Sequence, residues 1–215
     1  PILILFLFFV WVSDFKNPIY FSNRVAKNNS NFKMYKIRTM IINADKTGVS
    51  STSENDVRIT RLGKTIRKFK VDELLQFVNV LMGDMSVVGP RPNTRNQGVD
   101  LYTKNELKLL NVKPGITDLS SIVFSDEANI LKNSKDPDLS YNYLIRPWKS
   151  RLGLFYIEHS NFSLDIKIIW LTIVSLFNRE KALSGIKKIL YVNGAEKEII
   201  DVCLRKKKLI RKSPP

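Results

Sequence analysis

The chain opens with an uncharged apolar run from Pro1 to Val12 that ends at Ser13 and Asp14. A run of about twelve residues is too short to cross a bilayer, because a spanning helix needs about twenty. It suits a segment that lies in a membrane surface or turns back within it, with a buried core helix as the alternative. We do not expect a signal peptide, since the run has neither a basic start nor a small-residue cleavage site. Without an initiator Met, we expect a fragment.

The charge balance calls for an anionic partner. The 215 residues are 44% apolar, enough for one sizeable domain, and carry a formal net charge of +15. This excess suits nucleic acid, an acidic membrane face or phosphorylated substrates, and charge alone does not choose among them. The single Cys203 excludes an internal disulfide, and with only one His in the chain a zinc site is not expected.

An acidic pair, Asp72 and Glu73, follows a cationic stretch from Arg58 to Lys70 that contains no acidic residue. The spacing of Leu74, Val78 and Leu81 predicts a helix after the pair, with Asp72 at or near its N-cap. The positive end of that helix would keep both carboxylates ionised and would also attract phosphate oxygens. An anionic substrate would then need added cations, and the sequence offers Arg67 before the helix and Arg91 after it. The alternative is an ordinary helix start.

Other segments give simpler expectations. Alternating apolar residues from Phe32 to Ile37, interleaved with Lys33, Lys36 and Arg38, predict a half-buried strand. Residues 101–112 are expected to form a helix with Glu106 turned outward. The apolar helix expected over residues 162–177 would be buried or lie in a bilayer surface. The basic C-terminal tail either contacts anionic lipid or is solvated.

Four segments, in this order, resemble the bacterial sugar transferase family, the monotopic phosphoglycosyl transferases that load a sugar phosphate onto a polyprenyl phosphate. The resemblance runs from about Pro18 to about Phe177. The segments are Lys33-Met-Tyr-Lys-Ile-Arg-Thr-Met40, Arg67-Lys-Phe-Lys-Val-Asp72-Glu73-Leu-Leu-Gln76, Asn79-Val-Leu-Met-Gly83-Asp-Met-Ser86-Val-Val-Gly-Pro-Arg-Pro92 and Lys113-Pro-Gly-Ile-Thr117.

The resemblance implies an architecture. We expect a mostly helical α/β fold with a small sheet, in which residues 1–13 are part of a re-entrant membrane helix kinked at Pro1. Residues 14–185 would form the catalytic domain with interfacial amphipathic helices, and residues 186–215 a basic tail. The protein would then be monotopic, at the cytoplasmic face of a bacterial inner membrane.

The resemblance also implies a reaction. Asp72 would attack the sugar-linked phosphate of a nucleotide diphosphate sugar, such as a UDP-sugar, and the phosphosugar would pass to polyprenyl (undecaprenyl) phosphate. Glu73 would act beside it and hold Mg²⁺. Arg67 and Arg91 would neutralise the phosphates, and the resemblance adds Lys36 and Arg38 as phosphate contacts. For Lys36 and Arg38 the alternative is a solvated strand edge.

The sequence departs from the family pattern at three places. Leu75 replaces the usual proline after the acidic pair, Asp118 stands where Gly is usual, and residues 120–127 depart from the commoner Gly-Trp-Ala-Gln pattern, which leaves sugar recognition open. Two rival functions remain, a catalytically silent membrane scaffold and a nucleic-acid-binding module. We expect no nucleic acid, since no binding motif for it is recognisable. Membrane lipid is an expected partner, and a homo-oligomer stays open.

Overall fold

The computed structural model describes residues 2–44, 56–96 and 98–215. The kink expected at Pro1 lies outside these residues, as does most of the loop expected from Asn43 to Asp56. The described residues are mostly helical, which confirms the predicted α/β class. Their strands form two separate two-stranded sheets rather than one small sheet. No helix within the described ranges is both long enough and apolar enough to cross a membrane.

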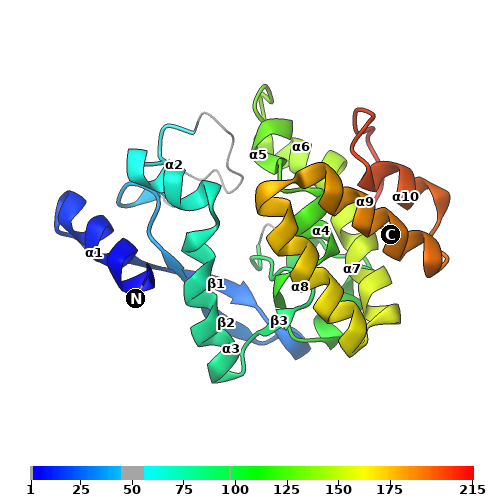
Figure 1. Cartoon of the computed structure of the whole chain (residues 1–215), viewed down its shortest axis with the longest axis horizontal. Coiled ribbons are helices and arrows are strands. Elements are labelled where there is room, and N and C mark those ends of the chain that lie inside the picture. Colours follow the sequence, from blue (N-terminus) through cyan, green and yellow to red (C-terminus); the bar gives the residue numbers. More distant parts are fainter. Residues whose placement is uncertain (1, 45–55, 97) are drawn as a thin grey trace.

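The first half of the chain builds the part of the molecule on the left of Figure 1. Its elements are α1 (Ile2–Asp14), β1 (Ile19–Val25), the 3-10 turn η1 (Lys27–Asn29), β2 (Asn31–Ile37), α2 (Arg61–Lys68), the 3-10 helix η3 (Val71–Leu75) and α3 (Gln76–Met82).

Strands β1 and β2 form an antiparallel hairpin in which Tyr20 pairs with Lys36 and Arg24 with Phe32. This confirms the strand predicted from the alternation after Phe32. Residues two apart on a strand, and residues paired across strands, share a face. Arg24 and Lys36 therefore lie on one face of the hairpin.

Helix α1 docks on this half along one stripe only. Val10 is buried in a cluster with Ile37, Ile66 and Leu75. Leu3, Phe6 and Leu7 pack against this cluster in part. The exposed apolar residues of α1 include Ile4, Phe8 and Trp11. The buried-core alternative for this segment is therefore wrong, because most of its apolar surface has no cover in the described structure.

Arg38 holds the end of α1. Its Nη1 and Nη2 donate to Asp14 at 2.6 and 2.7 Å, and its Nε donates to the carbonyl of Asn17 at 2.7 Å. A bidentate guanidinium–carboxylate pair fixes orientation as well as distance. The direction of α1 is thus set by a residue that directly follows β2.

Helix α3 has its polar side inward. Gln76 and Asn79 are fully buried, whereas Leu74, Val78 and Leu81 are exposed. The amide of Asn79 bonds to β2 on both sides, accepting from the backbone N–H of Tyr35 and donating to the carbonyl of Lys33. Gly83, at φ 86°, ends the helix in the left-handed conformation that favours glycine.

The second half of the chain, on the right of Figure 1, packs around the main core. Trp148, Leu152, Ile168 and Ile186 lie at the centre of this core. Its elements are β3 (Ser86–Val88), η4 (Val99–Leu101), η5 (Glu106–Asn111), β4 (Gly115–Thr117), α4 (Leu119–Val123), α5 (Glu127–Ile130), α6 (Pro137–Ser140), the π-helix η6 (Tyr141–Ile145), α7 (Arg146–His159), α8 (Phe162–Phe177), α9 (Arg179–Val192) and α10 (Lys197–Cys203).

The C-terminal residues fold back on this core. The expected domain boundary at residue 186 falls inside α9, and the core includes Ile186 and Cys203. Beyond α10 the chain contacts two helices. Arg151 of α7 donates to the carbonyl of Ser213, and Lys212 pairs with Glu198 of α10. The tail is therefore not frayed, and its contact with anionic lipid stays a prediction.

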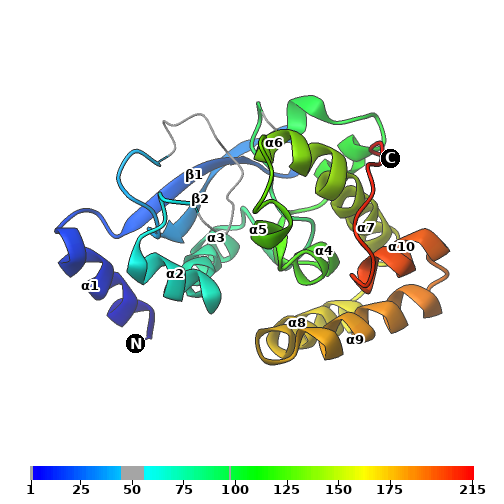
Figure 2. The ribbon, with the colours of Figure 1, turned by 90° about the horizontal axis from the view of Figure 1, so that it is seen from above.

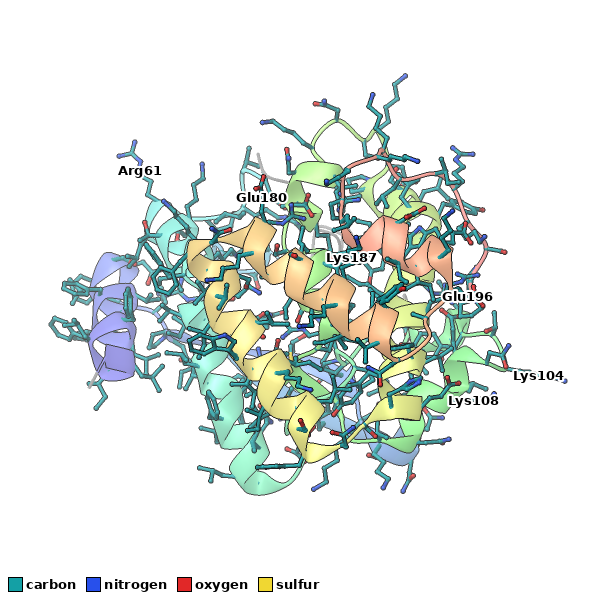
Figure 3. All side chains as sticks on the ribbon, turned by 45° about the vertical axis from the view of Figure 1, so that its right-hand side comes forward. Arg61, Lys104, Lys108, Glu180, Lys187 and Glu196 are labelled. Carbon is teal, nitrogen blue, oxygen red and sulfur yellow. The ribbon has the colours of Figure 1, made fainter. Side chains whose placement is uncertain are left out.

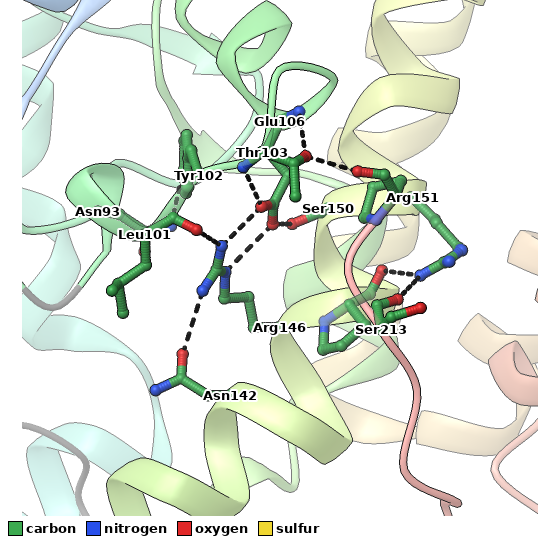
Figure 4. Close-up of polar contacts among 12 residues, drawn as sticks. Asn93, Leu101, Tyr102, Thr103, Glu106, Asn142, Arg146, Ser150, Arg151 and Ser213 are labelled. Atoms are coloured by element: carbon green, nitrogen blue, oxygen red, sulfur yellow. Dashed lines mark hydrogen bonds and ion pairs between the residues drawn. The ribbon is translucent and has the colours of Figure 1, made fainter.

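The helix expected over residues 101–112 is instead two short 3-10 helices, η4 and η5, and Glu106 is not turned outward. Its side chain is fully buried and accepts from Arg146 at 2.6 Å and from Ser150 at 2.6 Å (Figure 4). It also accepts from the backbone N–H of Thr103. This ion pair joins η5 to α7. It could not be predicted from sequence periodicity.

Arg146→Met tests this ion pair. Removing the guanidinium leaves the Glu106 carboxylate buried and unpaired, so we expect the free energy of unfolding to fall by about 3–5 kcal/mol. The control, Glu198→Gln, breaks an ion pair whose glutamate side chain is 43% exposed. It should cost less than about 1 kcal/mol. Urea unfolding followed by circular dichroism measures both, and equal losses would contradict the assignment.

Candidate functional site

The acidic pair lies in η3, between α2 and α3. Its helix start is not the one predicted: Lys70 precedes η3 in a left-handed conformation (φ 53°), and α3 begins only at Gln76. No cap bond from Asp72 forms, and within the described residues its carboxylate has no hydrogen-bond partner. Asp72 is nevertheless buried, with 8% of its surface exposed. A buried carboxylate without hydrogen bonds keeps its lone pairs available for attack.

Glu73 is tied to Arg91. The two terminal nitrogens of Arg91 donate to the two carboxylate oxygens of Glu73 at 2.6 and 3.1 Å, and one of them also donates to the carbonyl of Ile116. Lys36 approaches the same carboxylate, with Nζ 3.9 Å from Oε1. The structure therefore brings together three residues that the sequence predicted as a group.

The turn that carries Arg91 is rigid for identifiable reasons. Strands β3 and β4 pair in parallel on one side of it, and the amide of Gly115 donates to the carbonyl of Pro90 at 3.0 Å. A Cβ on Gly115 would lie only 2.1 Å from the backbone nitrogen of Gly89, so only glycine permits this close approach. The prolines on both sides of Arg91 remove further freedom.

Burial and the surrounding charges shift the pKa values of the two carboxylates in opposite directions. Burial alone would raise the pKa of Glu73, but Arg91, Lys36 and Lys70 lower it from its ordinary 4.5 to about 2. Burial raises the pKa of Asp72 above its ordinary 3.8, opposed by Lys36 and reinforced by the Glu73 charge. Glu73 is thus a fixed anion, and Asp72 is the more basic partner.

The two remaining predicted cations have different places. Arg67 lies beside the pair: its Nε donates to Thr39 at 2.8 Å, and its charge and that of Asp72 shift each other's pKa. Arg38 lies apart from it. Its donors are used by Asp14 and Asn17, as described above, so they are not available to a phosphate in this arrangement.

Sequence reasoning missed two cations at this site. Lys70 and Arg24 both lie near Arg91, and burial lowers the pKa of each. Neither was singled out from the sequence. Pairing the two strands would have placed Arg24 on the same face as Lys36.

Asp118, one of the departures from the family pattern, begins α4. Its carboxylate accepts from the backbone N–H of Ser121 at 2.7 Å and from the hydroxyl of Ser120 at 2.7 Å. The hydroxyl of Ser121 accepts in return from the backbone N–H of Asp118, which completes a capping box. This substitution therefore has a local structural role.

The residues present fit a magnesium ion carried with a diphosphate. The described residues contain no cluster of three or more metal-binding side chains. Mg²⁺, however, is commonly held by one or two carboxylates together with substrate phosphates and water. Each oxygen of Glu73 has two lone-pair directions, of which Arg91 uses one, so the carboxylate can still serve as a ligand.

Comparison with known proteins identifies the family. Residues 1–179 match the bacterial sugar transferase family. The chain belongs to this family, as its motifs predicted.

Three relatives show the range of the match. The first is the UDP-N-acetylgalactosamine-undecaprenyl-phosphate N-acetylgalactosaminephosphotransferase of Aeromonas hydrophila, 34% identical over 73% of this chain and 34% of its own length. The galactosyl transferase CpsE of Streptococcus agalactiae is 37% identical over 72% of this chain and 33% of its own. The uncharacterized sugar transferase EpsL of Bacillus subtilis is 34% identical over 80% and 76%. The chain thus spans about a third of the length of the first two.

The acid stability of Glu73→Gln tests the charge arrangement. Because the folded-state pKa of Glu73 is lowered, its ionised form stabilises the fold above pH 4.5, and this stabilisation is lost as the pH falls toward about 2. We expect wild type to be more stable than Glu73→Gln at neutral pH and the difference to shrink across that window. Urea unfolding measures it. When both proteins also carry Arg91→Met, the difference in their free energies of unfolding should be smaller at every pH. A difference that does not change with pH would contradict the ionised pairing of Glu73.

Proposed function

We propose that this chain transfers a sugar 1-phosphate from a nucleotide diphosphate sugar to a polyprenyl phosphate, through a covalent phosphosugar on Asp72. The observation that carries the proposal is the pair itself. One carboxylate is buried, more basic and free of hydrogen bonds, and its neighbour is held by Arg91 and Lys36. The undecaprenyl phosphate and the UDP-sugar named for the Aeromonas relative support this substrate class.

In the first step, an oxygen of Asp72 attacks the sugar-bearing phosphorus. The new bond joins the carboxylate to phosphorus, while the bond to the nucleoside phosphate oxygen breaks and the nucleoside monophosphate leaves with its electron pair. Because the attacking group and the substrate are both anionic, the barrier depends on nearby cations. Lys36, Arg67 and Arg91 are already placed and need little rearrangement.

In the second step, an oxygen of polyprenyl phosphate attacks the same phosphorus and displaces the carboxylate. The product is a polyprenyl diphosphate sugar, and Asp72 is regenerated as an anion. No proton has to move in either step. This agrees with a site in which the described residues supply cations and carboxylates around the phosphorus but no histidine.

We propose that Glu73 holds Mg²⁺ together with the substrate diphosphate. When bound, the metal would neutralise charge on the phosphate oxygens. Arg91 keeps Glu73 ionised and oriented for that task. It would also contact the phosphates once the metal takes part of the Glu73 charge.

We further propose that the protein lies on the cytoplasmic face of the membrane through one apolar surface, here called the apolar face. A polyprenyl tail stays in lipid, so the site has to reach the headgroup plane. In Figure 2, α1, α2, α3 and α8 lie toward the lower edge of the molecule. The hairpin, α6 and α7 lie toward the upper edge. The exposed residues that define the apolar face are Ile4, Leu5, Phe8, Phe9, Trp11, Val12, Phe15, Phe69, Leu74, Phe77, Val78, Leu81, Met82, Phe162, Ile166, Trp170, Ile173 and Phe177.

An exposed apolar surface of this extent is rare on a protein that meets only water. Its helices lie side by side rather than across the molecule, which suits insertion to headgroup depth. Basic side chains lie near its borders: Figure 3 shows Arg61 projecting outward from α2 and places Lys187 on α9, the helix beside α8. Such residues favour anionic headgroups.

Asp72→Asn tests the mechanism. The amide cannot form the phosphosugar ester, so we expect release of nucleoside monophosphate from labelled nucleotide sugars to fall at least about 1000-fold. Asp201→Asn, an exposed carboxylate on α10, is the matched control and should keep wild-type turnover. Membranes carrying each variant are assayed with polyprenyl phosphate. A normal rate for Asp72→Asn would remove the mechanism, and no release by wild type would favour the scaffold alternative.

Ile166→Glu tests the apolar face. Ile166 on α8 is 50% exposed, and Leu139 on α6 is 49% exposed away from that face. A charge at Ile166 has to be driven into the lipid surface, so we expect vesicle binding to weaken about tenfold or more, and Leu139→Glu to have no effect. Co-sedimentation with anionic vesicles measures both. Equal behaviour of the two variants would rule out this orientation on the membrane.

A further inference from the structure

Arg24 lies near the end of β1 and shares a face of the hairpin with Lys36. Lys36 contacts Glu73, so this face of the hairpin is a wall of the site. Arg24 is farther along that wall, four residues beyond Tyr20, the residue of β1 that pairs with Lys36. The charge of Arg24 acts on the pKa of Lys36, and Arg91 is near enough to act on the pKa of both.

The Arg24 guanidinium has no partner within the described part of the chain. Its Nε is buried without a hydrogen bond, and none of the described residues gives it a hydrogen bond or an ion pair. By contrast, Arg38, Arg91 and Arg146 each bind a carboxylate. An arginine stays charged at physiological pH, so a half-buried one without an anion destabilises the free protein.

The neighbours of Arg24 do not supply that anion. The groups that act on it electrostatically are Arg91, which is another cation, together with Tyr20 and Tyr141. Neither carboxylate of the acidic pair is among them, whereas both act on Lys36. Arg24 therefore belongs to the site but lies one step farther from the nucleophile than Lys36 does.

We propose that Arg24 binds the phosphate of the departing nucleoside monophosphate, an assignment that rests on the proposed function. The phosphate attacked by Asp72 has to lie at the acidic pair. The second phosphate of the same diphosphate is the one that reaches a cation farther along the wall. There, Arg24 and Arg91 would share it through charge-assisted hydrogen bonds.

The position in the molecule favours the nucleotide over the lipid phosphate. In Figure 2 the hairpin lies behind the helices that carry the apolar face. The far end of β1 is held there by the loop after Arg91, since the amide of Val25 donates to the carbonyl of Asn93 at 3.0 Å. A soluble nucleotide can enter and leave on that side, whereas the phosphate of a polyprenyl chain is confined to the headgroup plane.

Arg24→Gln and Lys33→Gln form a matched pair for the test. Each removes one positive charge from the same hairpin, but Lys33 is exposed and lies on the opposite face. We expect Arg24→Gln to raise the KM for the nucleotide sugar and the Kd for UMP about 10- to 100-fold. The KM for polyprenyl phosphate should stay within about twofold. Lys33→Gln should match wild type in all three quantities.

A second measurement uses the stability of the free protein. Because Arg24 is an uncompensated charge, Arg24→Met should unfold at a higher temperature than wild type without nucleotide. It should also gain less stabilisation than wild type when UMP is added. A lower melting temperature together with unchanged UMP affinity would assign Arg24 to folding alone.

The outcomes separate this inference from the proposed function. A raised KM for polyprenyl phosphate with unchanged UMP affinity would move Arg24 to the acceptor and overturn the assignment. Equal UMP affinity of Arg24→Gln and Lys33→Gln would also overturn it, as would a failure of wild type and both variants to bind UMP. If wild type releases nucleoside monophosphate and Asp72→Asn does not, the proposed function stands in either case.

Discussion

The bidentate pair between Glu73 and Arg91 is the interaction on which the site depends. It joins η3 to the Gly-Pro-Arg-Pro turn, and through the carbonyl of Ile116 it reaches β4. Lys36 adds the β1–β2 hairpin to the same carboxylate. Three segments far apart in the sequence therefore meet at one glutamate. Without its cations this half-buried carboxylate would be costly, and with them it stays anionic. Burial makes its neighbour Asp72 more basic.

The reversed polarity of α3 follows from two requirements on one short helix. Its inner side has to fix β2, and the amide of Asn79 does so by bonding two backbone groups of that strand. Its outer side carries Phe77, Val78 and Leu81, which an ordinary globular protein would bury. The same helix can thus secure the wall of the site and, on its other side, meet lipid. An apolar stripe identifies a helix but does not say which side faces the core.

The sequence predicted the local groupings better than the long-range ones. The strand after Phe32, the helix over residues 162–177 and the meeting of Lys36, Glu73 and Arg91 could be predicted, since each rests on periodicity or on motifs in order. Asp72 lies in the first turn as predicted but does not cap it, because the 3-10 helix η3 begins at Val71 with Lys70 as its left-handed N-cap. Glu106 was placed outward because its partner, Arg146, is forty residues away in sequence. The place of Arg24 beside Lys36 could not be predicted from the pattern of one strand, because it depends on how the two strands pair.

A short path of contacts joins the acidic pair to α1. Lys36 contacts Glu73 near the end of β2, and Arg38, two residues later, clamps the end of α1 through Asp14. Val10 of α1 also packs against Leu75, the last residue of η3. The positions of α1 and Asp72 therefore cannot change independently by much. Under the proposed function this coupling is needed, because an error of a few ångströms between Asp72 and a phosphate at the headgroup plane would separate the reacting atoms.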